Sequence, residues 1–192
     1  MRNDGNREGS LHGLFEDLEQ QAEGLHLAER DAEVTDRSRA EYSQVTMAAR
    51  MHASVGGNFS LRVQGVGRLA GVLVRVGSDW CLVRAEPAGQ EWIVQLRAIL
   101  EVAGLSPRAV SEPARSVLAR LGLGSALRHV AESGAVVVLD CVDGSRRRGT
   151  LVRVGADFVE VAGGEEPATP HREGDPGRCV LPFAALAAIR TS

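Results

Sequence analysis

The residues best suited to chemistry in this sequence are arginines gathered around one Asp-Gly turn. Guanidinium groups bind phosphate in a bidentate manner, so such a cluster at a hairpin tip suits a nucleic-acid backbone. The opposite interpretation is a solvated turn, since Asp140 and Asp143 dilute the positive charge and no aromatic residue interleaves to stack bases. The candidate arginines are Arg146, Arg147, Arg148, Arg153 and Arg178.

No other set of side chains has a spacing typical of catalysis or metal binding. The five histidines are scattered, and the sequence contains no HExxH pattern, phosphate-binding loop, dinucleotide fingerprint or Ser-His-Asp order. Asp79 and Asp157 recur at equivalent positions of a repeat, which favours a role in fixing turns. We therefore expect no enzymatic activity, no catalytic residue, no cofactor and no metal ion.

Composition favours a cytoplasmic protein without a global attraction to polyanions. The 192 residues carry a formal net charge of −3, and all 22 cationic residues are arginines, as is typical of a GC-rich bacterial genome. The three cysteines lack CxxC spacing, which indicates reduced thiols. We expect no signal peptide and no membrane span, because the first residues have no apolar core and no apolar run approaches ~18 residues.

An identical pentapeptide occurs twice and organises the rest of the chain. Leu73-Val74-Arg75-Val76-Gly77 returns as residues 151–155, inside a hydrophobic frame that matches at a constant offset of 78 residues. Farther along the chain the offset becomes 87, so residues 94–99 align with residues 181–186. This self-similarity predicts a duplicated small β domain. Strands are predicted in the first copy at 59–66, 68–76, 79–84, 91–97 and 98–103.

The expected fold class is α+β, with a long N-terminal helix and two tandem five-stranded small β-barrels joined by a short helical connector. Apolar residues at helical spacing predict the N-terminal helix, and strand-like runs between Gly- and Asp-containing turns predict the barrels. The predicted boundaries are 1–10 for a tail, 11–55 for the helix, 58–104 for the first barrel, 105–134 for the connector and 135–192 for the second barrel.

The predicted N-terminal helix carries an apolar stripe that needs a partner. Leu14, Leu18 and Leu25 provide its large side chains, and the stripe becomes small and polar beyond Glu29. Such a stripe suits a helix that packs on its own domain or in a dimer, and it makes a poor long coiled coil. We expect the helix to dock on the barrels.

Strand alternation predicts a second apolar surface on the barrels. It directs Leu73 and Trp80 of the first copy, and Leu151 and Phe158 of the second, away from the barrel interiors. An outward apolar face must be covered or used by a partner. Cover by the helix or by the other repeat is the structural interpretation, and a partner groove is the functional one.

The arginine turn resembles the first motif of Sm-like proteins, the family of the bacterial RNA chaperone. The matching stretch is Asp143-Gly144-Ser145-Arg146-Arg147-Arg148-Gly149-Thr150-Leu151. The resemblance implies a strongly bent five-stranded small barrel of Sm-like or SH3-like type, in a family often assembled into RNA-binding rings. Asp157 comes two positions later than the family spacing, and the family's following Asn is absent, so RNA binding does not carry across.

The whole chain also resembles a family of actinobacterial proteins of unassigned function, some of which carry a transcription-regulator label. Its Leu-Phe-Glu-Asp-Leu-Glu-Gln-Gln-Ala opening carries this likeness. We expect a non-enzymatic binding or scaffold module that acts through protein–protein interaction or self-association. The alternative is an Sm-like RNA- or DNA-binding or transcription-associated regulator that uses the hairpin arginines. No membrane and no small-molecule substrate is expected among its partners.

Overall fold

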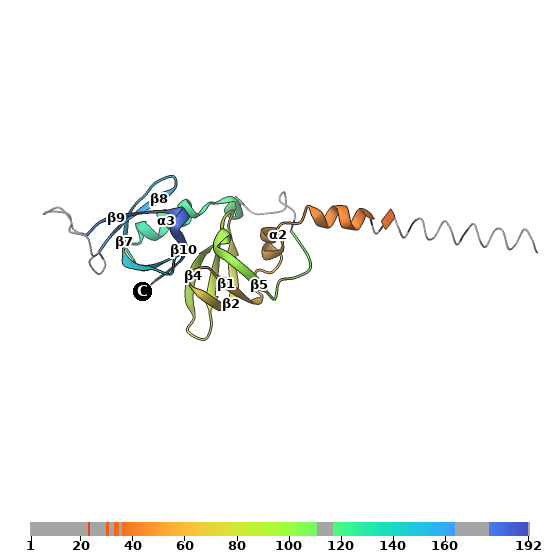
Figure 1. Cartoon of the computed structure of the whole chain (residues 1–192), viewed down its shortest axis with the longest axis horizontal. Coiled ribbons are helices and arrows are strands. Elements are labelled where there is room, and N and C mark those ends of the chain that lie inside the picture. Colours follow the sequence, from red (N-terminus) through yellow and green to blue (C-terminus); the bar gives the residue numbers. More distant parts are fainter. Residues whose placement is uncertain are drawn as a thin grey trace, which may run out of the picture. The chain divides into compact units, whose positions relative to one another are not determined.

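The computed structural model describes residues 23, 30, 33–34, 36–110, 117–163 and 177–191, and it divides into two compact units, Met1–Val45 and Thr46–Ser192. In the first unit residues 36–43 are helical. In the second unit, ten antiparallel strands form one sheet (Figure 1). No helix in the described part of the chain is both long and apolar enough to cross a membrane.

The expected continuous helix over residues 11–55 is wrong, and the fold is mainly β instead of α+β. The helix of the first unit ends before Gln44, and Val45 and Thr46 are not helical. A separate helix, α2 (Met47–His52), begins after Thr46, whose side-chain hydroxyl accepts a hydrogen bond from the Ala49 amide at 3.1 Å. An extended Thr at the N-cap position starts a new helix and interrupts the preceding one. Leu14, Leu18 and Leu25 lie outside the described residues.

The first half of the sheet contains β1 (Asn58–Val63), β2 (Gly67–Val76), β3 (Trp80–Ala85), β4 (Gln90–Gln95) and β5 (Ile99–Ala103). The second half contains β6 (Val136–Cys141), β7 (Arg146–Val154), β8 (Phe158–Ala162), β9 (Cys179–Pro182) and β10 (Leu186–Thr191). These strands fall where the alternating pattern and the Gly- and Asp-containing turns predict them. A 3-10 turn precedes the last strand of each half, η1 (Leu96–Ala98) before β5 and η4 (Phe183–Ala185) before β10.

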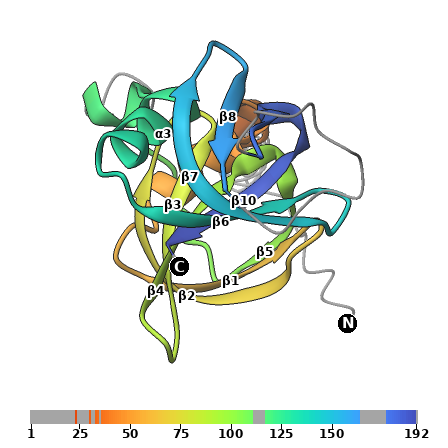
Figure 2. The same ribbon diagram turned by 90° about the vertical axis from the view of Figure 1, so that its left-hand side faces the viewer.

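The two halves are not separate barrels, because the strand order is β5-β1-β2-β3-β4-β10-β6-β7-β8-β9. Strand β4 of the first half pairs antiparallel with β10 of the second, with Ala188 opposite Val94, Ile189 opposite Ile93 and Arg190 opposite Trp92. Figure 2 shows β1 and β2 at the bottom of the unit and β7 and β8 at the top. Edge strands leave backbone amides and carbonyls without partners, and the β4–β10 pairing satisfies them at this junction.

The halves repeat each other strand for strand, including their irregularities. Within the first half the order is β5-β1-β2-β3-β4, and within the second it is β10-β6-β7-β8-β9. The β2–β3 ladder skips Val74, as the β7–β8 ladder skips Val152. The β1–β5 ladder skips Leu100, and the β6–β10 ladder skips Ala187. The same β-bulges at the same repeat positions show that the duplication extends to backbone detail.

The bulges overturn part of the predicted division between inner and outer faces. Leu73 and Leu151 are buried in the two hydrophobic cores and do not lie on an outer face. An extra residue in one strand reverses the alternation beyond it, so Leu73 and Val76 point to the same side although they are three positions apart. Simple alternation along the sequence could not anticipate this.

A short helix precedes the first strand of each half. The offset of 78 residues places α2 over residues 125–130, inside α3 (Leu123–Glu132). A 3-10 turn, η3 (Val117–Arg120), precedes α3. Met51 of α2 is buried in the first core and Leu127 of α3 in the second. Each repeat is therefore a helix followed by five strands, and α3 belongs to the second repeat more than to a connector.

Candidate functional site

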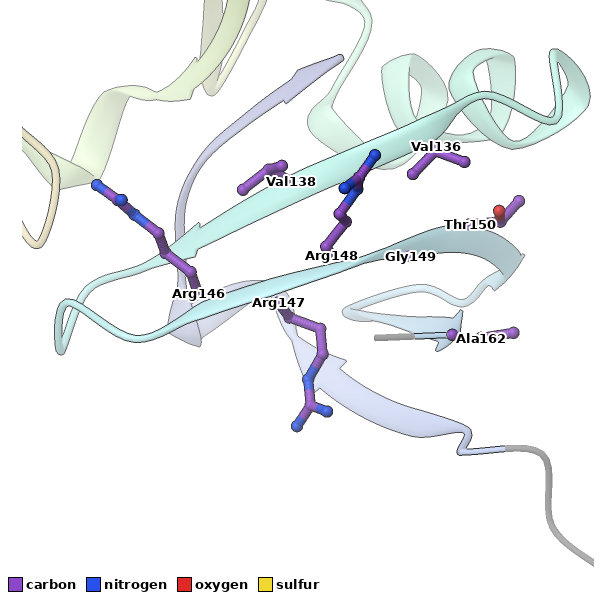
Figure 3. Close-up of a pocket in the computed structure, with 9 residues that line it drawn as sticks. Val136, Val138, Arg146, Arg147, Arg148, Gly149, Thr150 and Ala162 are labelled. Carbon is purple, nitrogen blue, oxygen red and sulfur yellow. The ribbon is translucent and has the colours of Figure 1, made fainter. Parts of the chain in front are cut away.

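The hairpin between β6 and β7 forms a hollow of about 850 Å³, here called the arginine hollow (Figure 3). The three consecutive arginines line it together with Val136, Val138 and Thr150. The ladder places Arg148 opposite Val138 and Arg146 opposite Asp140. Strand geometry thus brings aliphatic and cationic groups of two strands to one face.

The three arginines do not point to one centre. Figure 3 shows Arg146 and Arg148 on one side of β7 and Arg147 on the other. Arg146 donates from Nε to Asp140 Oδ1 at 2.7 Å, so an acidic group balances its charge. Arg148 is exposed, whereas Arg147 is half-buried. The hollow therefore presents one cation well suited to bind an external anion.

Arg153 and Arg178 do not join this cluster. Arg153 lies on β7 opposite Glu160 of β8, and Arg178 precedes β9. Both side chains are exposed, and neither is among the residues that line the hollow. The turn itself is held by Asp143, whose Oδ1 accepts from the Ser145 amide at 2.9 Å and from its hydroxyl at 2.6 Å. These hydrogen bonds lower the pKa of the Asp143 carboxyl.

The β4–β10 pairing, here called the internal junction, is sealed by polar contacts as well as by the ladder. Gln95 Nε2 donates to the Phe183 carbonyl at 2.8 Å, and Arg97 donates to the same oxygen. The Arg190 guanidinium lies 4.9 Å from the centroid of the Trp92 ring. The Arg190 Nε is 3.5 Å from Asp140 Oδ2. The Asp140 carboxylate is buried and forms ion pairs with both Arg146 and Arg190. The junction therefore joins the repeats firmly.

Helix α3 covers the outer face of the first repeat at this junction. Trp80 points away from the first core into the second, and its Nε1 donates to the Leu121 carbonyl at 2.9 Å. Asp79 Oδ1 accepts from the Leu123 amide at 2.7 Å and so caps α3 across 44 residues of sequence. The other repeat thus supplies the cover predicted for Trp80. Phe158, its counterpart in the second repeat, is half-buried.

The two ends of the sheet are the features that sequence reasoning missed. In the described part of the chain, β5 pairs with β1 alone and β9 pairs with β8 alone. Leu100 on β5 is 53% exposed, and Val180 on β9 is 60% exposed. Apolar side chains on strand edges with open backbone groups are ready sites for another strand. The sequence signal that could have indicated these edges is the repeat itself, because it assigns each strand of the first half a counterpart in the second half.

The described residues contain no group of three or more His, Cys, Asp or Glu side chains arranged to hold a metal ion. Cys81 and Cys141 are buried and Cys179 is partly exposed, all as free thiols. Burial raises the pKa of the Cys81 thiol to about 12, so it is a hydrophobic core group and a poor nucleophile.

The chain was also compared with known proteins. It matches no model of a known protein family, and no curated protein matches it.

Proposed function

We propose that this chain is a non-enzymatic binding module that acts through protein–protein contacts at the two free edges of its sheet. The supporting observation is that, among the described residues, each edge strand has a neighbouring strand on one side alone and carries an exposed aliphatic side chain, Leu100 on β5 and Val180 on β9. Strand addition of this kind gains affinity from main-chain hydrogen bonds and specificity from alternate side chains. The free thiols support a place for this module in the reducing cytoplasm.

The test compares two variants, one with a valine on an edge strand replaced by lysine and one with an exposed valine elsewhere replaced in the same way. Val180→Lys places a charge on the β9 edge, and Val152→Lys places the same charge on β7, where the side chain is also exposed and does not line the arginine hollow. Proteins retained by the immobilised full chain, including further copies of it, should be retained by Val152→Lys and lost from Val180→Lys. Equal retention by both variants and the wild type would exclude the edges as the binding surface.

A second candidate function is nucleic-acid binding by the arginine hollow. Its specific support is that Arg148 is exposed beside Thr150 in a hollow large enough for a phosphate and its sugar. Arg148→Ala should weaken binding of single-stranded RNA or duplex DNA and reduce the slope of log affinity against log salt by about one unit. Arg153→Ala, which lies outside the hollow, is the matched control. Absence of binding at low salt removes this candidate.

A further inference from the structure

We propose that the partner at these edges is a second copy of this chain. Strand β9 of one copy pairs antiparallel with β5 of the next and thereby repeats the internal junction between molecules. This inference rests on the proposed function and names its partner. It follows from the way the duplicated halves are joined.

Each chain contains two pairs of strands that could form this junction. One pair forms it inside the chain, and the other pair lies at the two ends of the sheet, where neither strand has a second partner among the described residues. By repeat position, β9 is the counterpart of β4, and β10 is the counterpart of β5. The internal junction joins β4 to β10, so the strands left at the two ends of the sheet, β9 and β5, are the complementary pair. Inside the chain, the second half follows the first in a fixed arrangement. If the first half of another copy follows the second half in the same arrangement, its β5 lies beside β9.

The internal register fixes the register between molecules. The offset of 87 residues applies to β4 and β9 and equally to β5 and β10, and the bulges at Leu100 and Ala187 confirm that alignment. The internal pairs are Val94 with Ala188, Ile93 with Ile189, and Trp92 with Arg190. The corresponding pairs between molecules are Leu181 with Glu101, Val180 with Val102, and Cys179 with Ala103.

Side chains of β5 and β9, the strands at the ends of the sheet, are more exposed than their counterparts in β10 and β4, as this pairing requires. Ala187, the bulged residue of β10, is fully buried at 0% exposure, whereas its counterpart Leu100 on β5 is 53% exposed. Ile93 on β4 is partly buried in the second core, whereas its counterpart Val180 on β9 is 60% exposed. Leu100 and Val180 therefore lie at the repeat positions where the internal junction buries Ala187 and Ile93.

Three substitutions make the contact between molecules weaker than the internal one. Pro182 and Ala184 occupy the positions of Gln95 and Arg97, so the two donors to the Phe183 carbonyl have no counterparts. Glu160 occupies the position of Leu82, which packs against the second core. We therefore expect a reversible association that depends on protein concentration. A head-to-tail contact of this type closes into a ring or continues as a filament, and it has no two-fold symmetry.

A disulfide between neighbouring copies tests the register. Directly opposed residues of an antiparallel pair have Cα atoms roughly 4.5–5.5 Å apart, within the range that a disulfide spans. Ala103→Cys places a thiol opposite the native Cys179 of the next copy, while Cys81 and Cys141 remain buried. Mild oxidation of the full chain should give a ladder of dimers, trimers and larger species, and peptide mapping should find residue 103 joined to residue 179.

Two controls separate this pairing from random collision of thiols. Ala103→Cys combined with Cys179→Ser should lose the ladder, because a single exposed thiol per chain can join only two chains. Leu100→Cys places an exposed thiol on the same strand but opposite no cysteine, and it should also give no ladder. A ladder in which residues 100 and 179 are joined as efficiently as residues 103 and 179 would overturn the register.

Sedimentation of the native chain gives a second readout that needs no engineered cysteine. The wild type and Val152→Lys should form species larger than a dimer of the 20.4 kDa chain as the protein concentration rises, and Val180→Lys should shift that association to at least tenfold higher concentration. If the wild type stays monomeric and Val180→Lys no longer retains a different protein, the second copy is not the partner, but the proposed function stands. A two-fold dimer, or oligomers without the 103–179 link, overturns the head-to-tail pairing. Variants that associate and bind alike overturn both.

Discussion

The sharpest stability prediction concerns Asp140, the buried carboxylate beside the internal junction. Its side chain is 1% exposed and lies between Arg146 Nε at 2.7 Å and Arg190 Nε at 3.5 Å. Arg146 is 60% exposed, so it can recover hydration when Asp140 is removed. Arg190 is 22% exposed, and its buried Nε has no hydrogen-bond partner among the described residues, so it cannot. The cost of Asp140→Ala should therefore come mainly from the Arg190 charge.

Removing one member of a fully buried ion pair costs about 3–5 kcal/mol, whereas an exposed pair contributes about 0–1 kcal/mol. With one exposed and one largely buried partner, we expect Asp140→Ala to lower the free energy of unfolding by about 2–3 kcal/mol. Urea unfolding at neutral pH and low protein concentration measures this loss. Tryptophan fluorescence is a suitable signal because Arg190 stacks on Trp92.

A double variant distinguishes loss of the ion pair from loss of packing. Asp140→Leu with Arg190→Met replaces both charges by apolar groups and should recover most of the stability lost by Asp140→Ala, because no charge is then left buried without a partner. Glu91→Ala is the control and should have a much smaller effect, because it breaks an ion pair with Arg84 in which both side chains are about half exposed. An Asp140→Ala variant that loses less than about 0.5 kcal/mol, or a double variant less stable than the single one, would refute this reasoning.

Three further outcomes can be measured on the same chain. Gly77→Ala should lower the free energy of unfolding by about 1–3 kcal/mol, because the added Cβ would overlap the Trp80 indole that lies over this glycine. Gly124→Ala in α3 should raise it by up to about 1 kcal/mol in urea unfolding, since the new methyl group makes only ordinary contacts and alanine favours a helix. Burial raises the pKa of Cys81 from 9.0 to about 12, so the thiol is neutral in the fold while the unfolded chain ionises. The free energy of unfolding should therefore not depend on this thiol at a pH below 9.0, its pKa in the unfolded chain. Between that pH and about 12 it should fall by about 1.4 kcal/mol per pH unit. Cys81→Ala should lack that extra slope, and equal slopes in alkaline unfolding of the two proteins would contradict it.

The sequence by itself determined where the strands lie and that they are duplicated. Alternating apolar residues bounded by Gly- and Asp-containing turns are local signals, and the repeated Leu-Val-Arg-Val-Gly string aligns the copies without knowledge of the fold. The same local chemistry placed Arg146, Arg147 and Arg148 on a hairpin, since Asp143-Gly144 is a strong turn signal. These features depend on neighbours along the chain.

The tertiary structure decided what depends on partners far along the chain. The bulges at Val74 and Val152 bury Leu73 and Leu151, and such bulges are set by the facing strand as well as by the strand itself. The pairing of β4 with β10 turned two expected barrels into one sheet. Backbone amides and carbonyls are alike at every residue except proline, so the sequence does not reveal which edge they will join. Only the assembled fold shows which two strands, β5 and β9, end the sheet in the described part of the chain.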